Sequence, residues 1–241
     1  MTESSGVVAS RRAPGRFWTH NDSDDGAVIY CLDDQAASCG TWTVAGAEAF
    51  DWEDIAAGPG PEAGTPYLYI GDIGDNLAVR ASIVVYRVPE PESGASRGTT
   101  PRADVLTLRY PDEPHDAEAL MVHPTSGDVY VIVKEPSPSV YVARGPLVAG
   151  PARTMEKVAT LPVGGATALT SVTGADIAPD GTRVALCTYA EGFELVLPEG
   201  TSDFDAVWAQ PVRPLDLGPR PQGEGIAYSS DGRGIVTTSE R

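Results

Sequence analysis

An internal repeat is the feature of this sequence that most constrains its fold. Five segments share one order: a carboxylate or small polar residue, a short apolar strand, a turn and a second strand. Aligned on the residues Val7, Ile55, Leu120, Ile177 and Ile226, successive copies lie 48, 65, 57 and 49 positions apart. These spacings are at or a little above the roughly 40–50 residues of a four-stranded propeller blade. The repeat therefore predicts an all-β fold, a β-propeller.

The segments between the aligned positions support four antiparallel strands per unit. Tight-turn sequences such as PTSGD, PDG and SSDG separate the first two strands, as in a hairpin. Third strands are expected at AVIYCLD, SIVVYRV, SVYVAR and FELVL, and fourth strands at TWTVAG, DVLTLRY, MEKVATL and VRPLDLG. The stretch 90–103 is polar and rich in Pro and Gly, and is expected to be a surface loop inside the second blade.

We expect one domain over residues 1–241, with blades starting near residues 3, 51, 116, 173 and 222. The fifth unit has only its first two strands, which predicts a C-terminal truncation or imperfect ring closure; a six-bladed ring is the alternative. Its last strand, GIVTTS (234–239), is expected to be an open edge that associates with another chain. Apart from that association we expect a monomer.

Composition and charge exclude two classes of partner. The formal net charge is −17, from 34 acidic and 17 basic residues, and such a surface repels nucleic acid. No run of about 18 apolar residues is present, so no membrane span is expected. The N-terminal MTESSGVVASRR lacks the order of a signal peptide. The chain is therefore either cytoplasmic or a trimmed form of an exported protein.

Two of the three cysteines flank a turn in CLDDQAASC. Cys31 and Cys39 either close a small hairpin disulfide, which would imply an oxidising compartment, or remain unlinked. Cys187, in the apolar run RVALCTY, is expected to be a core residue.

Carboxylates at the start of the first strands are the main candidates for function. The first strand of each blade lines the central channel, so the repeat places these residues near one mouth of it. Grouped carboxylates repel one another unless protons or a cation hold them, and Ca²⁺ takes 6–8 oxygen ligands. We therefore predict a Ca²⁺ site there; the alternative is that these residues accept backbone hydrogen bonds between blades. The candidates are Asp51, Glu53, Asp54, Glu118, Asp176 and Glu224.

A second group of polar residues follows the second strands. HNDSDDG (20–26) and GDIGDN (71–76) occupy equivalent positions and bring His20, Asn21 and Asp72 toward the same mouth. Asp, Asn and Gly are also ordinary turn residues, which is the competing interpretation. In the third unit the equivalent position is occupied by Lys134, which would bind an anionic group or neutralise the ring of carboxylates. His20 and His115 are candidate ligands or bases, or alternatively hydrogen-bonded residues with no role in binding.

The motifs WTHNDSDD, DWEDIA, YLYIGDIGDN and IVVYRVPEP resemble those of a family of bacterial, mostly exported β-propellers that includes phytase-like and esterase-like members. The resemblance covers nearly the whole chain, is strongest over residues 17–91, and implies a secreted protein. It also implies several Ca²⁺ ions that bind substrate phosphate at the channel mouth. The residues that match such a role by position are Asp51, Glu53, Asp54, Asp72 and Glu118. The sequence has no cluster of Lys and Arg suited to a highly phosphorylated substrate.

Two classes of function follow. In the first, a bound divalent cation polarises a phosphoester or ester and activates water. In the second, the propeller is a non-catalytic module that binds a small molecule or a protein at the channel mouth. No GxSxG motif is present, so only a metal mechanism would make this chain a hydrolase.

Overall fold

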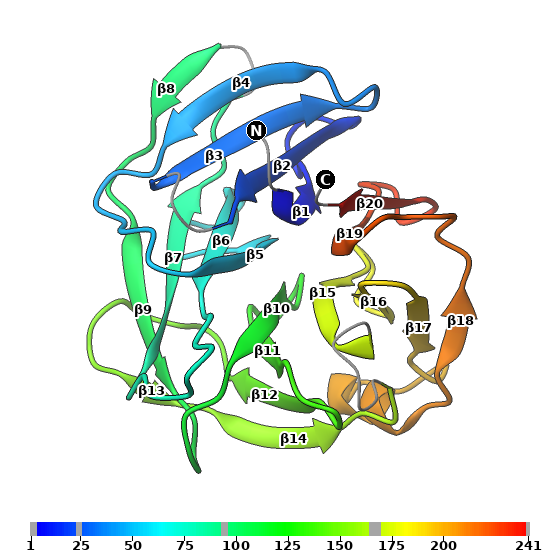
Figure 1. Cartoon of the computed structure of the whole chain (residues 1–241). Coiled ribbons are helices and arrows are strands. Elements are labelled where there is room, and N and C mark those ends of the chain that lie inside the picture. The colour runs from blue at the N-terminus through cyan, green and yellow to red at the C-terminus, as the bar shows by residue number, and fades with distance from the viewer. Residues whose placement is uncertain (1–3, 23–25, 93–95, 164–169, 240–241) are drawn as a thin grey trace.

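The computed structural model describes residues 4–22, 26–92, 96–163 and 170–239. They form five sheets arranged around one axis, each running outward from an inner strand (Figure 1). Neighbouring strands within a blade are antiparallel, as in the predicted β-propeller, and the predicted fold class is confirmed.

Chain order within each blade follows the strands from the inner edge to the outer edge. Blade 1 contains β1 (Ser4–Ala9), β2 (Arg16–Asn21), β3 (Val28–Asp33) and β4 (Ser38–Thr43). Blade 2 contains β5 (Trp52–Pro59), β6 (Pro66–Asp72), β7 (Ile83–Pro89) and β9 (Asp104–Arg109). Blade 3 contains β10 (Ala117–Val122), β11 (Val129–Val133), β12 (Ser139–Ala143) and β14 (Glu156–Thr160). Blade 4 contains β15 (Val172–Ile177), β16 (Arg183–Thr188), β17 (Gly192–Val196) and β18 (Arg213–Leu215), and blade 5 contains β19 (Gly223–Tyr228) and β20 (Ile235–Ser239).

The five inner strands close into a ring. Each packs against the next, and β19 packs against β1. The approach is close at Gly225, where a Cβ atom would lie 3.0 Å from both the backbone nitrogen and the Cγ1 of Val7. Among the described residues the inner strands thus form a closed ring in which β1 and β19 meet directly, although blade 5 has only two strands there.

Two blades also receive a short extra strand from the blade that follows. β8 (Arg97–Thr99) leaves blade 2 and pairs in parallel with β4 of blade 1, and β13 (Arg153–Thr154) leaves blade 3 and pairs in parallel with β9 of blade 2. The stretch 90–103 is thus more than the surface loop that its composition suggests. Gly98 permits this pairing, because a Cβ atom there would lie 2.4 Å from Trp42 Nε1.

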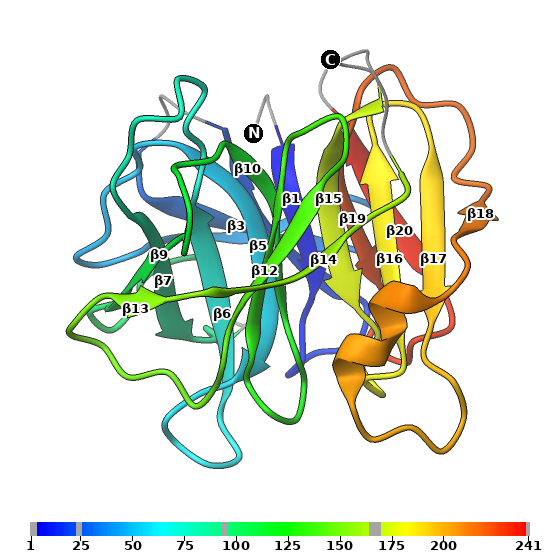
Figure 2. The same cartoon turned by 90° about the horizontal axis from the view of Figure 1, so that it is seen from below.

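Blade 4 reaches back to blade 3 in a similar way, but through a 3-10 helix in place of a strand. This helix, η2 (Phe204–Ala209), lies between β17 and β18 and packs against β14 of blade 3. Phe204 and Trp208 contact the ring of Tyr130, and the Tyr130 hydroxyl donates to Asp205 Oδ1 (2.8 Å). Figure 2 shows η2 and β13 on the outside of the ring, against the preceding blades.

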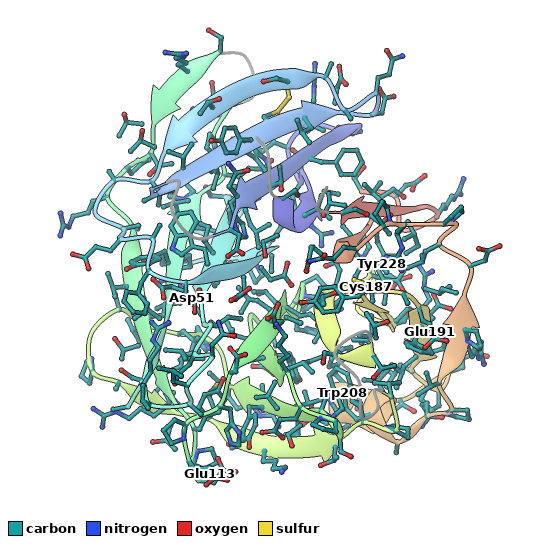
Figure 3. The ribbon with its side chains drawn as sticks, viewed as in Figure 1. Asp51, Glu113, Cys187, Glu191, Trp208 and Tyr228 are labelled. Carbon is teal, nitrogen blue, oxygen red and sulfur yellow. A yellow bond between two sulfur atoms is a disulfide. The ribbon has the colours of Figure 1, made fainter. Side chains whose placement is uncertain are left out.

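The apolar core lies between the blades. Five clusters of buried side chains correspond to the five interfaces between neighbouring blades. Figure 3 shows Cys187 and Tyr228 together in the cluster between blades 4 and 5. Cys31 and Cys39 form a disulfide across β3 and β4, with Cα atoms 5.1 Å apart, which settles the alternative that the sequence left open. No helix among the described residues has the length and apolar character to cross a membrane.

Candidate metal centre

A polar cavity of about 250 Å³ lies at one end of the channel. Its lining comes from two kinds of place, the start of an inner strand and the segment just after a second strand; blades 1 to 3 contribute both, blade 4 only the second and blade 5 only the first. Hairpin connectivity puts these two places at the same end of every blade. The lining residues are Ser5, Asp22, Asp51, Glu53, Asn76, Glu118, Lys134, Tyr189, Gln222 and Glu224.

A β-bulge near the start of each inner strand explains why carboxylates face this cavity. In blade 2 the pairing jumps from Trp52 with Asp72 to Asp54 with Gly71, so Glu53 is the extra residue. In blade 3 the corresponding extra residue is Glu118. A bulge leaves one residue out of the ladder and re-aims its side chain. Two consecutive acidic residues, Glu53 and Asp54, can therefore have quite different surroundings.

Two groups of three carboxylates have the spacing of metal ligands. One contains Asp22, Asp51 and Glu53, and the other contains Glu53, Asp116 and Glu118; within each group the ligand oxygens lie within 4.8 Å of one another. Glu53 belongs to both groups and is 6% exposed. Figure 3 labels Asp51 beside the start of β5, and Asp51 lines the cavity. Carboxylate oxygens of this kind suit a hard cation such as Ca²⁺.

The electrostatics of the cavity favour a proton or a cation. Burial raises the pKa of Glu53 well above its usual range, and the nearby carboxylates of Glu118, Asp22 and Asp51 raise it further. Burial, together with Asp22 and Asp116, also raises the pKa of Asp51. Raised values mean that the anionic forms are disfavoured, so a positive ligand would stabilise the site.

Lys134 compensates part of this charge. Its ammonium group forms an ion pair with Glu118, which raises the pKa of Lys134 even though burial acts in the opposite direction. The Lys134 nitrogen also lies 5.8 Å from the centre of the Tyr189 ring. Lys134 is the one basic side chain in the described lining of the cavity. Because Lys134 pairs with Glu118, the group of Asp22, Asp51 and Glu53 is the stronger candidate for a cation.

Gly74 keeps the space beside this group open. A Cβ atom at this position would lie 2.3 Å from Glu53 Oε1 and 2.5 Å from Asp51 Oδ2. The backbone N–H of Gly74 donates to the Asp51 carbonyl (3.2 Å), which fixes the approach of the two segments. The absence of a side chain at residue 74 thus allows the two carboxylates to converge.

Three of the predicted ligands are engaged elsewhere. Asp54 is 1% exposed, and its two oxygens accept the backbone N–H groups of Ile55 (2.8 Å) and Leu120 (2.9 Å). Asp176 Oδ2 accepts the N–H of Tyr228 (2.8 Å) in the next blade. These two residues thus make the inter-blade hydrogen bonds that were the alternative interpretation. Asp72 pairs with Arg80 (2.7 Å) and lies in neither carboxylate group.

The position of Asp176 follows from the bulge in its strand. In blade 4 the extra residue is Thr173, three residues before Asp176, so Thr173 takes the place that Glu53 has in blade 2. The Thr173 hydroxyl donates to the Gly223 carbonyl (2.8 Å). Glu224 does line the cavity, where Gln222 Nε2 donates to its Oε1 (2.9 Å).

The two predicted histidines and Asn21 do not line the cavity. His20 is fully buried against Trp52, and burial lowers its pKa. Asn21 ends β2, and its backbone carbonyl contacts His20 Nδ1 (2.8 Å). His115 is 8% exposed and contacts Glu135 (2.7 Å) and Asp112 (3.1 Å).

Several residues of the site were not singled out from the sequence, among them Asp22, Asn76, Asp116 and Tyr189. Asp22 and Asn76 lie inside the two Asp/Asn-rich segments, where several acceptors compete and the sequence does not rank them. Asp116 directly precedes β10, and a carboxylate two residues before Glu118 was a signal available in DAEAL. Tyr189 directly follows β16, as Lys134 directly follows β11. An alignment of the second strands of the repeat therefore held the signal for Tyr189.

Comparisons with known proteins add little to this geometry. No protein-family model matches the chain, and no curated protein sequence matches it, so the phytase-like and esterase-like family receives no support from them. Among solved structures, the chain is similar to one described as "Structure of U3-55K", with a TM-score of 0.46 and 12% sequence identity. The similarity covers 98% of this chain and 61% of that one, so this chain spans less than two thirds of its length.

Proposed function

We propose that this β-propeller binds a divalent cation, Ca²⁺, at the acidic mouth of its channel. The observation that carries the proposal is the position of Glu53, whose carboxylate lies at ligand spacing from Asp22 and Asp51 on one side and from Asp116 and Glu118 on the other. Three carboxylates provide up to six oxygens, and Asn76 lines the same cavity, which suits the 6–8 oxygen ligands of Ca²⁺.

The test is thermal unfolding and calorimetric titration with CaCl₂. A ligand that binds only the folded state adds about 2.7 kcal/mol at a 100-fold excess over Kd. For a domain of this size that corresponds to a Tm increase of roughly 5–10 °C. NaCl at matched ionic strength should give a much smaller increase, because an acidic surface that is merely screened responds to both salts alike.

Two variants make the test specific to the site. Gly74→Ala leaves every charge in place but puts a methyl group against Glu53 and Asp51, and should abolish most of the Ca²⁺ response. Asp51→Asn with Glu53→Gln should do the same. The matched control is Glu62→Gln with Glu199→Gln, which makes the same charge change at two exposed positions outside the cavity. An equal Ca²⁺ response in the site and control variants would reject the proposal.

A metal-dependent hydrolase of phosphoesters or esters is the catalytic version of this function. The observation that favours it is Lys134, which pairs with Glu118 and brings a positive charge into the same cavity as the carboxylates, where an anionic group would meet it. A bound cation would supply polarisation of the ester and activation of water. Turnover of p-nitrophenyl phosphate or p-nitrophenyl acetate that is lost with EDTA and in Gly74→Ala would support it. Calcium binding without turnover would favour the non-catalytic module, which binds a small molecule or a protein at the mouth.

We further propose an extracytoplasmic location, which the Cys31–Cys39 disulfide supports because such bonds persist in oxidising compartments. The fraction of this bond that is oxidised in protein isolated under thiol-trapping conditions tests the proposal. A fully reduced pair would contradict it.

A further inference from the structure

Exposed apolar side chains lie beside the acidic cavity. Five large apolar side chains are exposed among the described residues, and three of them are Phe50 (71%), Leu77 (81%) and Val79 (69%), on the loops that precede β5 and follow β6. Phe50 directly precedes Asp51, which lines the cavity, and Leu77 directly follows the lining residue Asn76. Single exposed apolar residues are ordinary, whereas a group of them marks an interaction surface. We call Phe50, Leu77 and Val79 the apolar rim.

Hydrogen bonds and an ion pair hold the two loops of the apolar rim together. The N–H of Phe50 donates to Asp72 Oδ2 (3.2 Å), and Arg80 forms an ion pair with Asp72 Oδ1 (2.7 Å). The Arg80 guanidinium also lies over the Phe50 ring, 5.1 Å from its centre, and donates to the Gly74 carbonyl (2.7 Å). The N–H of Arg80 donates to Asp75 Oδ2 (2.6 Å). The loops are therefore already ordered, so little conformational entropy is lost when a partner covers the apolar rim.

The cavity beside the apolar rim is larger than a metal ion needs. Its volume is about 250 Å³, whereas one water molecule in the liquid takes about 30 Å³, so a single cation leaves room for other groups. Lys134 shows that a basic side chain is accepted there, since its ammonium group pairs with Glu118 on one side of Glu53. Asp22 and Asp51 lie on the other side of Glu53, at ligand spacing. A guanidinium group, whose five N–H donors match the geometry of carboxylates, suits these oxygens.

The charge of the cavity favours a basic partner over an anionic one. Its described lining contains five carboxylates and one ammonium group, and the chain has a formal charge of −17. Even with one Ca²⁺ bound, the formal charge of this lining would be −2, from five negative charges and three positive ones. An anionic lipid surface or a phosphate group would be repelled, whereas a basic side chain would be attracted.

We propose that this mouth is a docking site for a segment of another polypeptide in which an arginine lies between apolar residues. The arginine side chain enters the cavity, and the flanking apolar side chains cover the apolar rim. The cavity is the one proposed above for Ca²⁺, but binding of the segment does not require the metal, and the two ligands compete. The apolar contact provides affinity, and the guanidinium group provides selectivity.

The probe is the peptide acetyl-ALRFA-amide, titrated calorimetrically into the protein in EDTA. Two control peptides separate the contributions of charge and apolar contact. The first has citrulline, an uncharged isostere, in place of the arginine; the second, acetyl-ASRSA-amide, keeps the charge without the apolar flanks. Each control should bind at least about tenfold more weakly than the probe. Equal binding of acetyl-ASRSA-amide would overturn the proposal, since attraction to the acidic surface alone would then explain the affinity.

Leu77→Ser with Val79→Ser tests the apolar rim and leaves every residue of the cavity lining in place. This variant should bind the probe at least about tenfold more weakly and keep the wild-type response to CaCl₂. The matched control, Val105→Ser with Val148→Ser, changes two exposed apolar residues outside the lining and should leave probe binding unchanged. Equal probe affinities in the two double variants would overturn the proposal.

Asp51→Asn with Glu53→Gln tests whether the arginine enters the cavity. This variant should also bind the probe at least about tenfold more weakly, because both carboxylates line the cavity. Glu62→Gln with Glu199→Gln makes the same charge change outside the lining and should have no effect. Unchanged affinity in Asp51→Asn with Glu53→Gln would place the arginine elsewhere and overturn the proposal.

CaCl₂ and lipid vesicles distinguish the other outcomes. Probe binding in EDTA that CaCl₂ does not weaken would support docking and count against Ca²⁺ in this cavity, whereas a CaCl₂ response without probe binding would do the reverse. We expect no sedimentation of the protein with phosphatidylcholine–phosphatidylserine vesicles in CaCl₂. Sedimentation that is lost in Leu77→Ser with Val79→Ser would show that a bilayer covers the apolar rim, and would overturn the proposal.

Discussion

The carboxylate of Asp54, at the start of the second inner strand, accepts the backbone N–H of Leu120 in the next blade at 2.9 Å. Asp54 is 1% exposed, so this hydrogen bond forms away from water. Asp176 makes a similar contact with the N–H of Tyr228, two blades further round the ring and two residues further along the strand. Buried carboxylates thus join neighbouring inner strands at the backbone, and the acidic motifs of the repeat serve structure as well as the cavity.

Asp54→Ala should therefore destabilise the fold. Removing the acceptor leaves the buried N–H groups of Ile55 and Leu120 without their partner, and each such group costs about 1–3 kcal/mol. We expect a loss of about 2–4 kcal/mol in the free energy of unfolding, measured by urea denaturation. Glu53→Ala, one residue earlier but aimed into the cavity, is the matched control and should cost less in the absence of metal. An equal loss in both variants would mean that the two carboxylates do not have separate roles.

The stability of the metal-free protein should fall as the pH rises from about 5 to about 8. Burial raises the pKa of Asp176 to about 7 and that of Glu53 well above its usual range. A carboxyl group whose pKa is higher in the folded state contributes stability that is fully present below its unfolded pKa, near about 4. That contribution is lost as the pH rises through the folded value.

Asp176→Asn should reduce this pH dependence, because the amide imitates the protonated acid. One pKa unit corresponds to about 1.4 kcal/mol. The change in unfolding free energy between about pH 5 and about pH 8, measured in EDTA, should be smaller in the variant by more than about 1 kcal/mol. Identical slopes in the two proteins would show that Asp176 does not titrate in this range.

The stabilisation caused by Ca²⁺ should depend on pH in the opposite direction, since a cation competes with protons for the same oxygens. The increase in Tm caused by a fixed CaCl₂ concentration should be larger at about pH 8 than at about pH 5, the opposite of the trend in the metal-free protein. A response that is independent of pH would argue against ligation by Glu53 and Asp51, whose pKa values are raised.

Lys134→Met should strengthen Ca²⁺ binding and weaken the metal-free fold. The substitution removes the positive charge paired with Glu118 and leaves a buried carboxylate without its partner. We expect Kd for Ca²⁺ to fall by about three- to tenfold, or roughly 0.7–1.4 kcal/mol, in calorimetric titration. Lys157→Met, on blade 3 but outside the cavity lining, is the control and should leave Kd unchanged. Weaker binding in Lys134→Met would indicate that Lys134 orders the site instead of competing with the cation.

The disulfide should contribute measurably despite its small loop. Cys31 and Cys39 are separated by eight positions, and the chain-entropy model gives about 2.5 kcal/mol for a loop of this size. Cys31→Ala with Cys39→Ala should lower the urea midpoint accordingly. Thiol titration of the denatured, non-reduced wild-type protein should find one free thiol, Cys187. Three free thiols would show that the bond is not formed.

The blade pattern could be predicted from the sequence because strand period and turn residues are local signals. Residues such as Val7, Ile55 and Leu120 recur at blade spacing, and each lies within an inner strand of the structure. The paired turns then fix the order of the strands within a blade. The parallel contacts of β8 and β13 were not predictable in this way, since they depend on which neighbouring blade a connection crosses.

Prediction of the site was limited because a shift of one residue in strand pairing decides which carboxylate faces the cavity. Glu53 and Asp54 are adjacent in DWEDIA, yet the bulge sends one side chain into the cavity and the other to Leu120. In TGADIA the bulge falls at Thr173, so matching that motif to DWEDIA placed Asp176 at the mouth. The alternation of apolar and polar residues along a strand specifies which side chains share a face. The position of a β-bulge, however, depends on the hydrogen bonds with the partner strand.

The backward-reaching segments β8, β13 and η2 have a mechanical consequence. Each passes from its own blade to the outer edge of the preceding one, so blades 1, 2 and 3 are each tied to the blade that follows by chain as well as by apolar contact. A blade in this part of the ring cannot be peeled away without first releasing a segment that belongs to its neighbour. Under tension these segments would be released in order from the C-terminal side: η2 first, then β13 and then β8.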